Sequence, residues 1–166
     1  MLRREHERQE TLRRLEHLLA LERDADELYR LAAEHLADPR YLETLSAFRV
    51  DARRRREGLE RIVREQGGRI PSGLDLRGRL EEIRLLLAQL GGDDAILRAL
   101  LTHAERTGKA YQQVQEHAPA ELQPLLQRGL EEVRQRRDWF ETAVQALESR
   151  PHRGVPPWNI PPPSGL

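Results

Sequence analysis

The sequence predicts an all-α protein built around a bundle of four long helices. Three observations favour this class. Aromatic residues make up 4% of the 166 residues, so the side chains that favour strands are scarce. Charged residues make up 34%, which is typical of helices with ion pairs along their exposed faces. Apolar residues recur every three or four positions over long stretches, the period of one helix face.

Chain breakers divide this periodic pattern into segments. The expected helices cover residues 12–36, 39–66, 74–90, 95–118 and, after Pro119 and Pro124, the stretch up to Leu147. Asp38 is the expected N-cap of the second helix, with Pro39 at its first position, where a missing N–H costs nothing. Gly67-Gly68 is typical of a helix C-terminus and ends that helix.

The lengths of the connections predict the topology. The links at Asp38-Pro39 and Ala118-Pro119 are tight, so each joins two antiparallel neighbours. The join between the second and third long helices takes about 25 residues and contains the shorter helix at 74–90. We therefore expect two helical hairpins joined by a long crossover, with the bundle over residues 1–150.

A proline-rich tail follows at 151–166. It holds six of the ten prolines, which exclude a helix and favour extended backbone. Two interpretations stay open: a disordered terminus, or a docking segment in which Trp158 and Ile160 enter a groove. That groove would belong to the chain's own bundle, to a second copy in a homodimer, or to another protein.

Two sets of residues resemble ferritin-like proteins. Glu22 and Tyr29, seven positions apart, are similar to the first helix of the rubrerythrin-type ferritin-like proteins. A second set is similar to an uncharacterised bacterial ferritin-like four-helix branch: 28–34 followed by Asp38-Pro39, then 71–73, 92–97, and Glu105 with Tyr111. The resemblance covers about residues 12–148. It implies a ferritin-like four-helix bundle and no particular activity.

Ferritin-like di-iron centres use one Glu from each of two helices and a Glu-x-x-His pair from each of the other two. No histidine in this chain has a Glu three positions before it. The residues found there are Arg3, Arg14, Ala32, Leu100, Val114 and Ser149. The sequence therefore predicts no metal and no cofactor.

Charged residues interrupt the apolar faces of the four long helices. Glu22 and Glu105 stand where the single carboxylates of such a centre would lie. Arg55 and either Arg136 or Arg137 stand near the positions of the Glu-x-x-His pairs. Because a guanidinium is permanently charged and binds a carboxylate through two hydrogen bonds, we expect a core ion-pair network in place of metal. The alternative is that these side chains flank the apolar stripes and reach solvent.

Four residues are expected to line this network: Tyr29, Tyr111, Gly58 and Gly108. A glycine inside a helix costs about 1 kcal/mol relative to alanine, so another group usually fills the space. Arginine side chains are one candidate for that group, and close helix packing is the other.

Several function classes are disfavoured. The net charge is zero, and the run 53–56 of four arginines spreads around a helix among acidic neighbours, so we expect no nucleic-acid binding. The chain has no cysteine and no apolar stretch of about 18 residues, and its first residues do not resemble a signal peptide. We therefore expect a cytoplasmic protein without membrane contact.

Two functions remain as hypotheses. The first is a non-catalytic structural or interaction protein whose core is held by Arg–Glu ion pairs, with the tail as its docking segment. The alternative is a di-metal oxidoreductase or iron-handling protein, which would use Glu22, Glu105, Asp26 and His103. Because ferritin-like proteins similar to this one are sometimes held in encapsulin shells by C-terminal peptides, this alternative includes an encapsulated cargo.

Overall fold

The computed structural model describes residues 1–149, and these residues form helices and no strands. The elements are α1 (Leu2–His35), α2 (Arg40–Glu65), α3 (Leu74–Gln89), α4 (Gly92–Gln115), a short 3-10 helix (Ala120–Leu122) and α5 (Gln123–Glu148). The expectation of an all-α protein is confirmed for this part of the chain. The predicted tail and the boundary at residue 150 lie outside the described residues.

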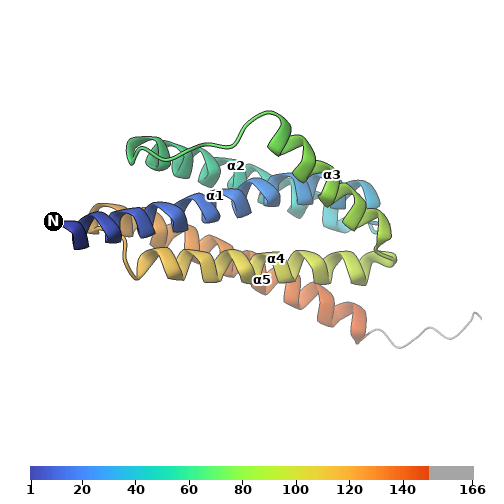
Figure 1. Ribbon diagram of the computed structural model, residues 1–166. Coiled ribbons are helices and arrows are strands. Elements are labelled where there is room, and N and C mark those ends of the chain that lie inside the picture. Colours follow the sequence, from blue (N-terminus) through green and yellow to red (C-terminus); the bar gives the residue numbers. More distant parts are fainter. Residues whose placement is uncertain (150–166) are drawn as a thin grey trace, which may run out of the picture.

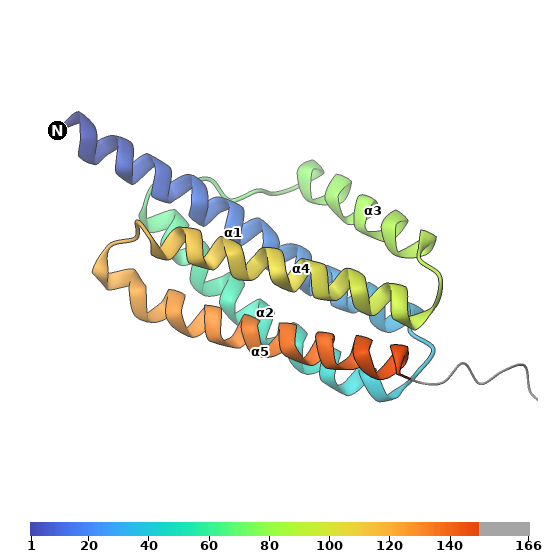
Figure 2. The same cartoon turned by 90° about the horizontal axis from the view of Figure 1, so that it is seen from below.

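The long helices form two antiparallel hairpins, α1 with α2 and α4 with α5 (Figure 1). The hairpins meet where α1 packs against α4 (Figure 2). Helices α2 and α5 are in contact through side chains, in the ion pair of Arg55 with Glu132 and the ring contact of Phe48 with Trp139. The connection from α2 to α4 runs the length of the bundle and carries α3, which packs on α1.

The end of α2 follows from its two glycines. Gly67 has a φ of 77°, a conformation that glycine adopts without steric cost. The N–H groups of Gly67 and Gly68 then donate to the carbonyl oxygens of Arg64 and Val63, at 3.0 and 2.8 Å. These two hydrogen bonds are the Schellman motif that Gly67-Gly68 predicts.

The start of α2 differs from the prediction by one residue. Pro39 occupies the N-cap, and the helix begins at Arg40. Asp38, expected as the cap, accepts a hydrogen bond from the Arg40 N–H at 3.0 Å. The short segment between α1 and α2 is fixed by α4. Asp93 at the start of α4 accepts hydrogen bonds from the N–H groups of Ala37 and Asp38.

The buried interior consists of two apolar clusters along the bundle axis. One is built around Tyr29, Leu97 and Phe140. The other is built around Leu15, Tyr111 and Val133. Between them each long helix places a buried polar residue on its core face, and we name this set the polar layer: Glu22, Arg55, Thr107 and Arg136. Asp24 of α1 is also buried but contacts α3 instead.

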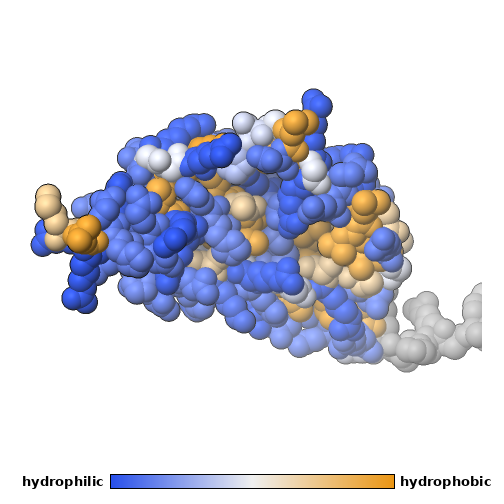
Figure 3. All heavy atoms as spheres, viewed as in Figure 1, coloured by the Kyte–Doolittle hydropathy of each residue, from blue (hydrophilic) through white to orange (hydrophobic). Residues whose placement is uncertain are grey.

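Helix α3 is attached to α1 by one charged contact and two buried side chains. Arg79 donates three hydrogen bonds to the Asp24 carboxylate, the shortest at 2.7 Å, while Ile83 and Leu87 are buried. Other leucines of α3 remain exposed: Leu74, Leu80, Leu85 and Leu86. Figure 3 shows apolar side chains at the surface in the region where Figure 1 places α3.

No helix within residues 1–149 combines the length and the apolar composition needed to cross a bilayer.

Candidate functional site

The polar layer is the candidate site because it places charged groups in the middle of an apolar bundle. On α1, Glu22 lies between the buried Leu18 and Ala25. On α2, Arg55 lies between the buried Ala52 and Leu59. The helical period that buries the apolar residues therefore also turns these charges inward.

Glu22 and Arg55 form a buried ion pair. The Glu22 side chain is fully buried, and the Arg55 side chain is 7% exposed. The Nε of Arg55 donates to both carboxylate oxygens of Glu22, at 3.2 Å each. Burial alone would lower the pKa of Arg55, but the charge of Glu22 and further acidic partners raise it above its ordinary value.

Glu132 is a second carboxylate of this site, which was not predicted from the sequence. It lies on α5 with its side chain 22% exposed, and it accepts a hydrogen bond from the Nη1 of Arg55 at 2.9 Å. Arg54 and Arg128 donate to it from the surface. Against the effect of burial, the hydrogen bond from Arg55 keeps the pKa of Glu132 below its usual value. The sequence signal that could have identified Glu132 is its spacing of four residues from both Arg128 and Arg136, which places the three side chains on one face of a helix.

Arg136 is the arginine that α5 contributes to the polar layer. It is 1% exposed, and its guanidinium carbon lies 5.1 Å from the centre of the Tyr29 ring. The nearest carboxylate oxygen, Oε1 of Glu22, is 3.9 Å from its Nη2. That distance is too long for a hydrogen bond, and Nε, Nη1 and Nη2 all lack a hydrogen-bond partner among the described residues.

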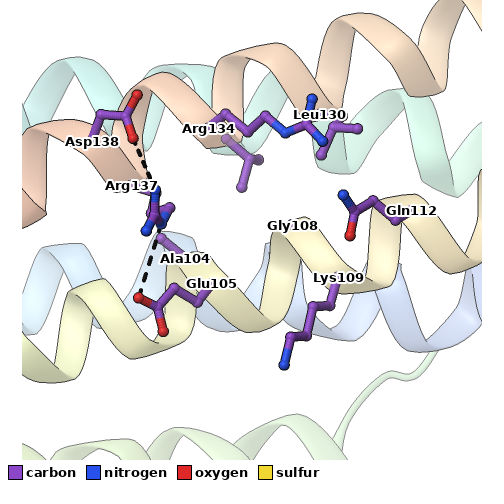
Figure 4. Close-up of a pocket in the computed structure, with 10 residues that line it drawn as sticks. Ala104, Glu105, Gly108, Lys109, Gln112, Leu130, Arg134, Arg137 and Asp138 are labelled. Atoms are coloured by element: carbon purple, nitrogen blue, oxygen red, sulfur yellow. Dashed lines mark hydrogen bonds and ion pairs between the residues drawn. The ribbon is translucent and has the colours of Figure 1, made fainter.

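Glu105 and Arg137 do not belong to the buried network, so this part of the prediction is wrong. Their side chains are 47% and 40% exposed and lie 3.9 Å apart on the outside of α4 and α5. Figure 4 shows Arg137 between Asp138 and Glu105 at the wall of a surface hollow of about 640 Å³. The alternative expectation, that the charges reach solvent, holds for Arg137 and is wrong for Glu22 and Arg55.

The phase of α4 explains the error at Glu105. Buried residues of α4 follow one line along the helix: Leu97, Leu100, Ala104, Thr107, Tyr111 and Val114. Glu105 comes one residue after that line and therefore points about 100° away from it. Thr107 takes the inward position instead, and its hydroxyl donates to the His103 carbonyl at 2.9 Å.

Of the four predicted lining residues, the two tyrosines are buried around the polar layer. Burial raises the pKa of Tyr29 to about 12 and also raises that of Tyr111. Gly58 lies beside Arg55 in a groove between α2 and α5, where a side chain would meet Leu125 at 3.6 Å. Gly108 faces the open hollow, and a Cβ added there would meet no atom of the described residues within 4 Å. The space beside Gly108 is therefore not filled by an arginine side chain.

The glycine that does accommodate a neighbour is Gly129. A Cβ there would lie 2.5–2.8 Å from ring atoms and the hydroxyl of Tyr111. The buried Tyr111 ring therefore packs directly on the α5 backbone. Of the two explanations for helix glycines, close packing is the one that applies here.

The residues of the metal-binding alternative are not brought together. Asp26 lies at the α1–α2 seam, where it accepts hydrogen bonds from Arg49, Arg53 and Arg56. Both ring nitrogens of His103 are buried without a partner in the described part of the chain. Burial, and then the nearby positive charges of Arg136 and others, lower the pKa of His103 to about 3. Within residues 1–149 no three His, Cys, Asp or Glu residues form a group suited to a metal ion.

Each member of the arginine run 53–56 has a carboxylate partner. Arg53 and Arg56 contact Asp26, Arg54 contacts Asp51 and Glu132, and Arg55 contacts Glu22 and Glu132. The run therefore serves the contacts of α2 with α1 and α5.

The two tail residues predicted to dock, Trp158 and Ile160, lie outside the described residues. Searches for matching protein families, curated proteins and solved structures found no match to this chain.

Proposed function

We propose that this protein is a non-catalytic helical bundle of the ferritin-like type, in which arginines take the place of a di-metal centre. It acts as a structural or interaction protein, and its tail is a docking segment. The observation that carries the proposal is the ion pair between the Glu22 carboxylate and Arg55. Both carboxylate oxygens accept from Arg55, so the one fully buried carboxylate among residues 1–149 is not free to bind a metal.

The ferritin-like assignment rests on topology and sequence. Two antiparallel hairpins joined by a long crossover are the arrangement of that fold. Glu22, Arg55 and Arg136 occupy the middle of the bundle, where that fold binds metal. The missing Glu-x-x-His pairs support loss of the metal site within that architecture.

An interaction role is supported by the exposed leucines of α3. Leu85 and Leu86 are adjacent and more than half exposed, and Leu74 is 82% exposed. Exposed apolar clusters commonly mark contacts with other proteins. The tail adds Trp158 and Ile160 among its prolines as a second contact.

Metal analysis tests the metal-free core. The full chain is expressed with iron supplementation, purified without chelators and analysed for iron, manganese and zinc. We expect far less than one metal ion per chain. About two iron ions per chain would overturn the proposal and favour the di-metal function.

A truncation tests the docking role of the tail. The mass of the full chain in solution is compared with that of a chain lacking residues 155–166 and with a Trp158→Ala/Ile160→Ala variant. We expect both changes to reduce the assembly or abolish partner binding to the same extent. Identical masses and identical binding for all three would overturn the role of the tail and leave the metal-free core unaffected.

A further inference from the structure

The unsatisfied guanidinium of Arg136 is the least explained group in the described structure. It is 1% exposed, and none of its three nitrogens makes a hydrogen bond within residues 1–149. Buried polar groups in proteins nearly always have a partner, and a buried cation without one is costly. This side chain therefore points to an acceptor that the chain itself does not supply.

The neighbouring carboxylates are already engaged. Glu22 uses both oxygens for the Nε of Arg55, and Glu132 accepts from Arg54, Arg55 and Arg128. The Nη2 of Arg55 is buried without a partner as well. Two buried arginines thus offer four nitrogens for which the described residues provide no acceptor.

The buried groups around this point already balance in charge. Arg55 and Arg136 are the two buried guanidinium groups, and Glu22 and Glu132 are the two carboxylates beside them. Arg54 and Arg128 contact Glu132 from the surface with side chains 45% and 73% exposed, so water screens their charges. The described residues therefore leave hydrogen-bond donors of Arg136 and Arg55 without acceptors, which a ligand with acceptor oxygens would provide.

A groove between α2 and α5 leads to both buried arginines. It has a volume of about 370 Å³ and is lined by Arg55, Arg136, Thr44, Gln135, Phe48 and Trp139. The rings of Phe48 and Trp139 meet edge to face, with their centres 5.6 Å apart. Asp51 and Glu132 also line the groove, and both are paired with arginines.

We propose that this groove binds a small monocarboxylate with an apolar or aromatic body. The planar carboxylate matches the planar guanidinium of Arg136, which can donate two parallel hydrogen bonds, and Nη2 of Arg55 offers a third. Phe48 and Trp139 provide an apolar wall for the body of the ligand. Because Arg136 is 1% exposed, a ligand reaches it when a side chain of the groove wall moves, and Trp139 is half-buried at that wall.

Titration of the full chain with benzoate tests this site. The chain has two tryptophans, so Trp158→Phe leaves Trp139 as the fluorescent reporter. Benzoate is the probe, benzamide is its neutral analogue of the same shape, and inorganic phosphate tests for general anion binding, all at constant ionic strength. We expect a saturable change in Trp139 fluorescence and a higher melting temperature with benzoate alone.

Two methionine variants locate the binding group. Arg136→Met removes the guanidinium and keeps the length of the side chain, and we expect benzoate affinity to fall at least about tenfold. Arg137→Met removes the exposed neighbour on the same helix, and we expect unchanged affinity. Equal effects of benzoate and benzamide, equal effects of benzoate and phosphate, or full affinity in Arg136→Met would each overturn the proposal. The benzoate and benzamide comparison decides the matter even where a variant does not fold. Failure of this site leaves the proposed function unaffected.

Discussion

Arg55 is bound at both ends of its guanidinium: its Nε donates to both oxygens of Glu22 on α1, and its Nη1 donates to Glu132 on α5. One arginine of α2 thereby connects three helices at the middle of the bundle. The pair of Glu22 and Arg55 separates the two apolar clusters, and it explains how a fully buried carboxylate is tolerated there.

Replacing Arg55 with leucine should strongly destabilise the protein. The substitution leaves Glu22 buried without its cation, so we expect the free energy of unfolding to fall by about 3 kcal/mol or more. Denaturation in urea measures it. Arg53→Leu is the matched control, because Arg53 is half exposed and should cost less than about 1 kcal/mol. A loss for Arg55→Leu no larger than that of the control would contradict the assigned role.

Replacing Arg136 with methionine should not destabilise the free protein. Arg136 makes no hydrogen bond among the described residues, so an apolar side chain of similar length removes a desolvated cation. We expect the free energy of unfolding to rise by about 1 kcal/mol. Urea denaturation without added carboxylate is the measurement, with Arg137→Met as the near-neutral control. A loss of stability beyond about 1 kcal/mol would mean that the contacts of Arg136 with the Tyr29 ring and with Glu22 outweigh the cost of burying its charge.

Stability should decrease as the pH falls from 7 to 5, because of His103. In the folded protein the pKa of His103 is lowered to about 3, while in the unfolded chain it stays near 6.5. Below pH 6.5 the unfolded chain therefore binds a proton that the folded protein does not. We expect a loss of about 1 kcal/mol for each pH unit in this range.

The control for this effect is His103→Gln, which has no titrating group and should have a flatter profile between pH 7 and 5. Glu132 does not interfere in this window, because its pKa is lowered below 4.5 and its contribution is lost at more acidic pH. Identical slopes for the two proteins would show that His103 is protonated in the folded state.

Two glycine substitutions should have opposite effects. At Gly129 an alanine Cβ would lie 2.5 Å from the buried Tyr111 ring, so we expect a loss of about 1–3 kcal/mol. At Gly108 an alanine Cβ would meet no described atom within 4 Å, so we expect a gain of about 0.5–1 kcal/mol from helix propensity. Thermal melts of both variants compare them, and a shift of the same sign would disagree with the packing described for Tyr111.

The fold could be predicted largely from local sequence signals. Apolar periodicity indicated the all-α class, and Gly67-Gly68 indicated the end of α2, because both depend on residues close together in the chain. The cap at Asp38 was displaced by one residue, since Asp93 of α4 holds the same link from a distance. Such a long-range contact leaves no local signal.

The polar layer could be predicted only in part, because the helical period indicates the burial of some of its residues and not of others. Glu22 and Arg55 lie well within the apolar lines of their helices, so their burial follows from the helical period. Arg136 and Arg137 are equally compatible with Val133 and Phe140 as neighbours, and three-dimensional packing decides between them. Glu132 was missed because it lies at the edge of the buried face of α5. At such a position the helical spacing of apolar residues does not predict whether a side chain is buried.

A double-mutant cycle on Glu22 and Arg55 measures how strongly the two buried side chains stabilise each other. Glu22→Leu, Arg55→Leu and the double variant are compared with the unaltered protein by urea denaturation at pH 7. We expect a coupling free energy of about 2 kcal/mol or more, with the double variant more stable than Arg55→Leu alone. Additive losses, with a coupling of less than about 0.5 kcal/mol, would show that Glu22 and Arg55 do not stabilise each other in the folded protein.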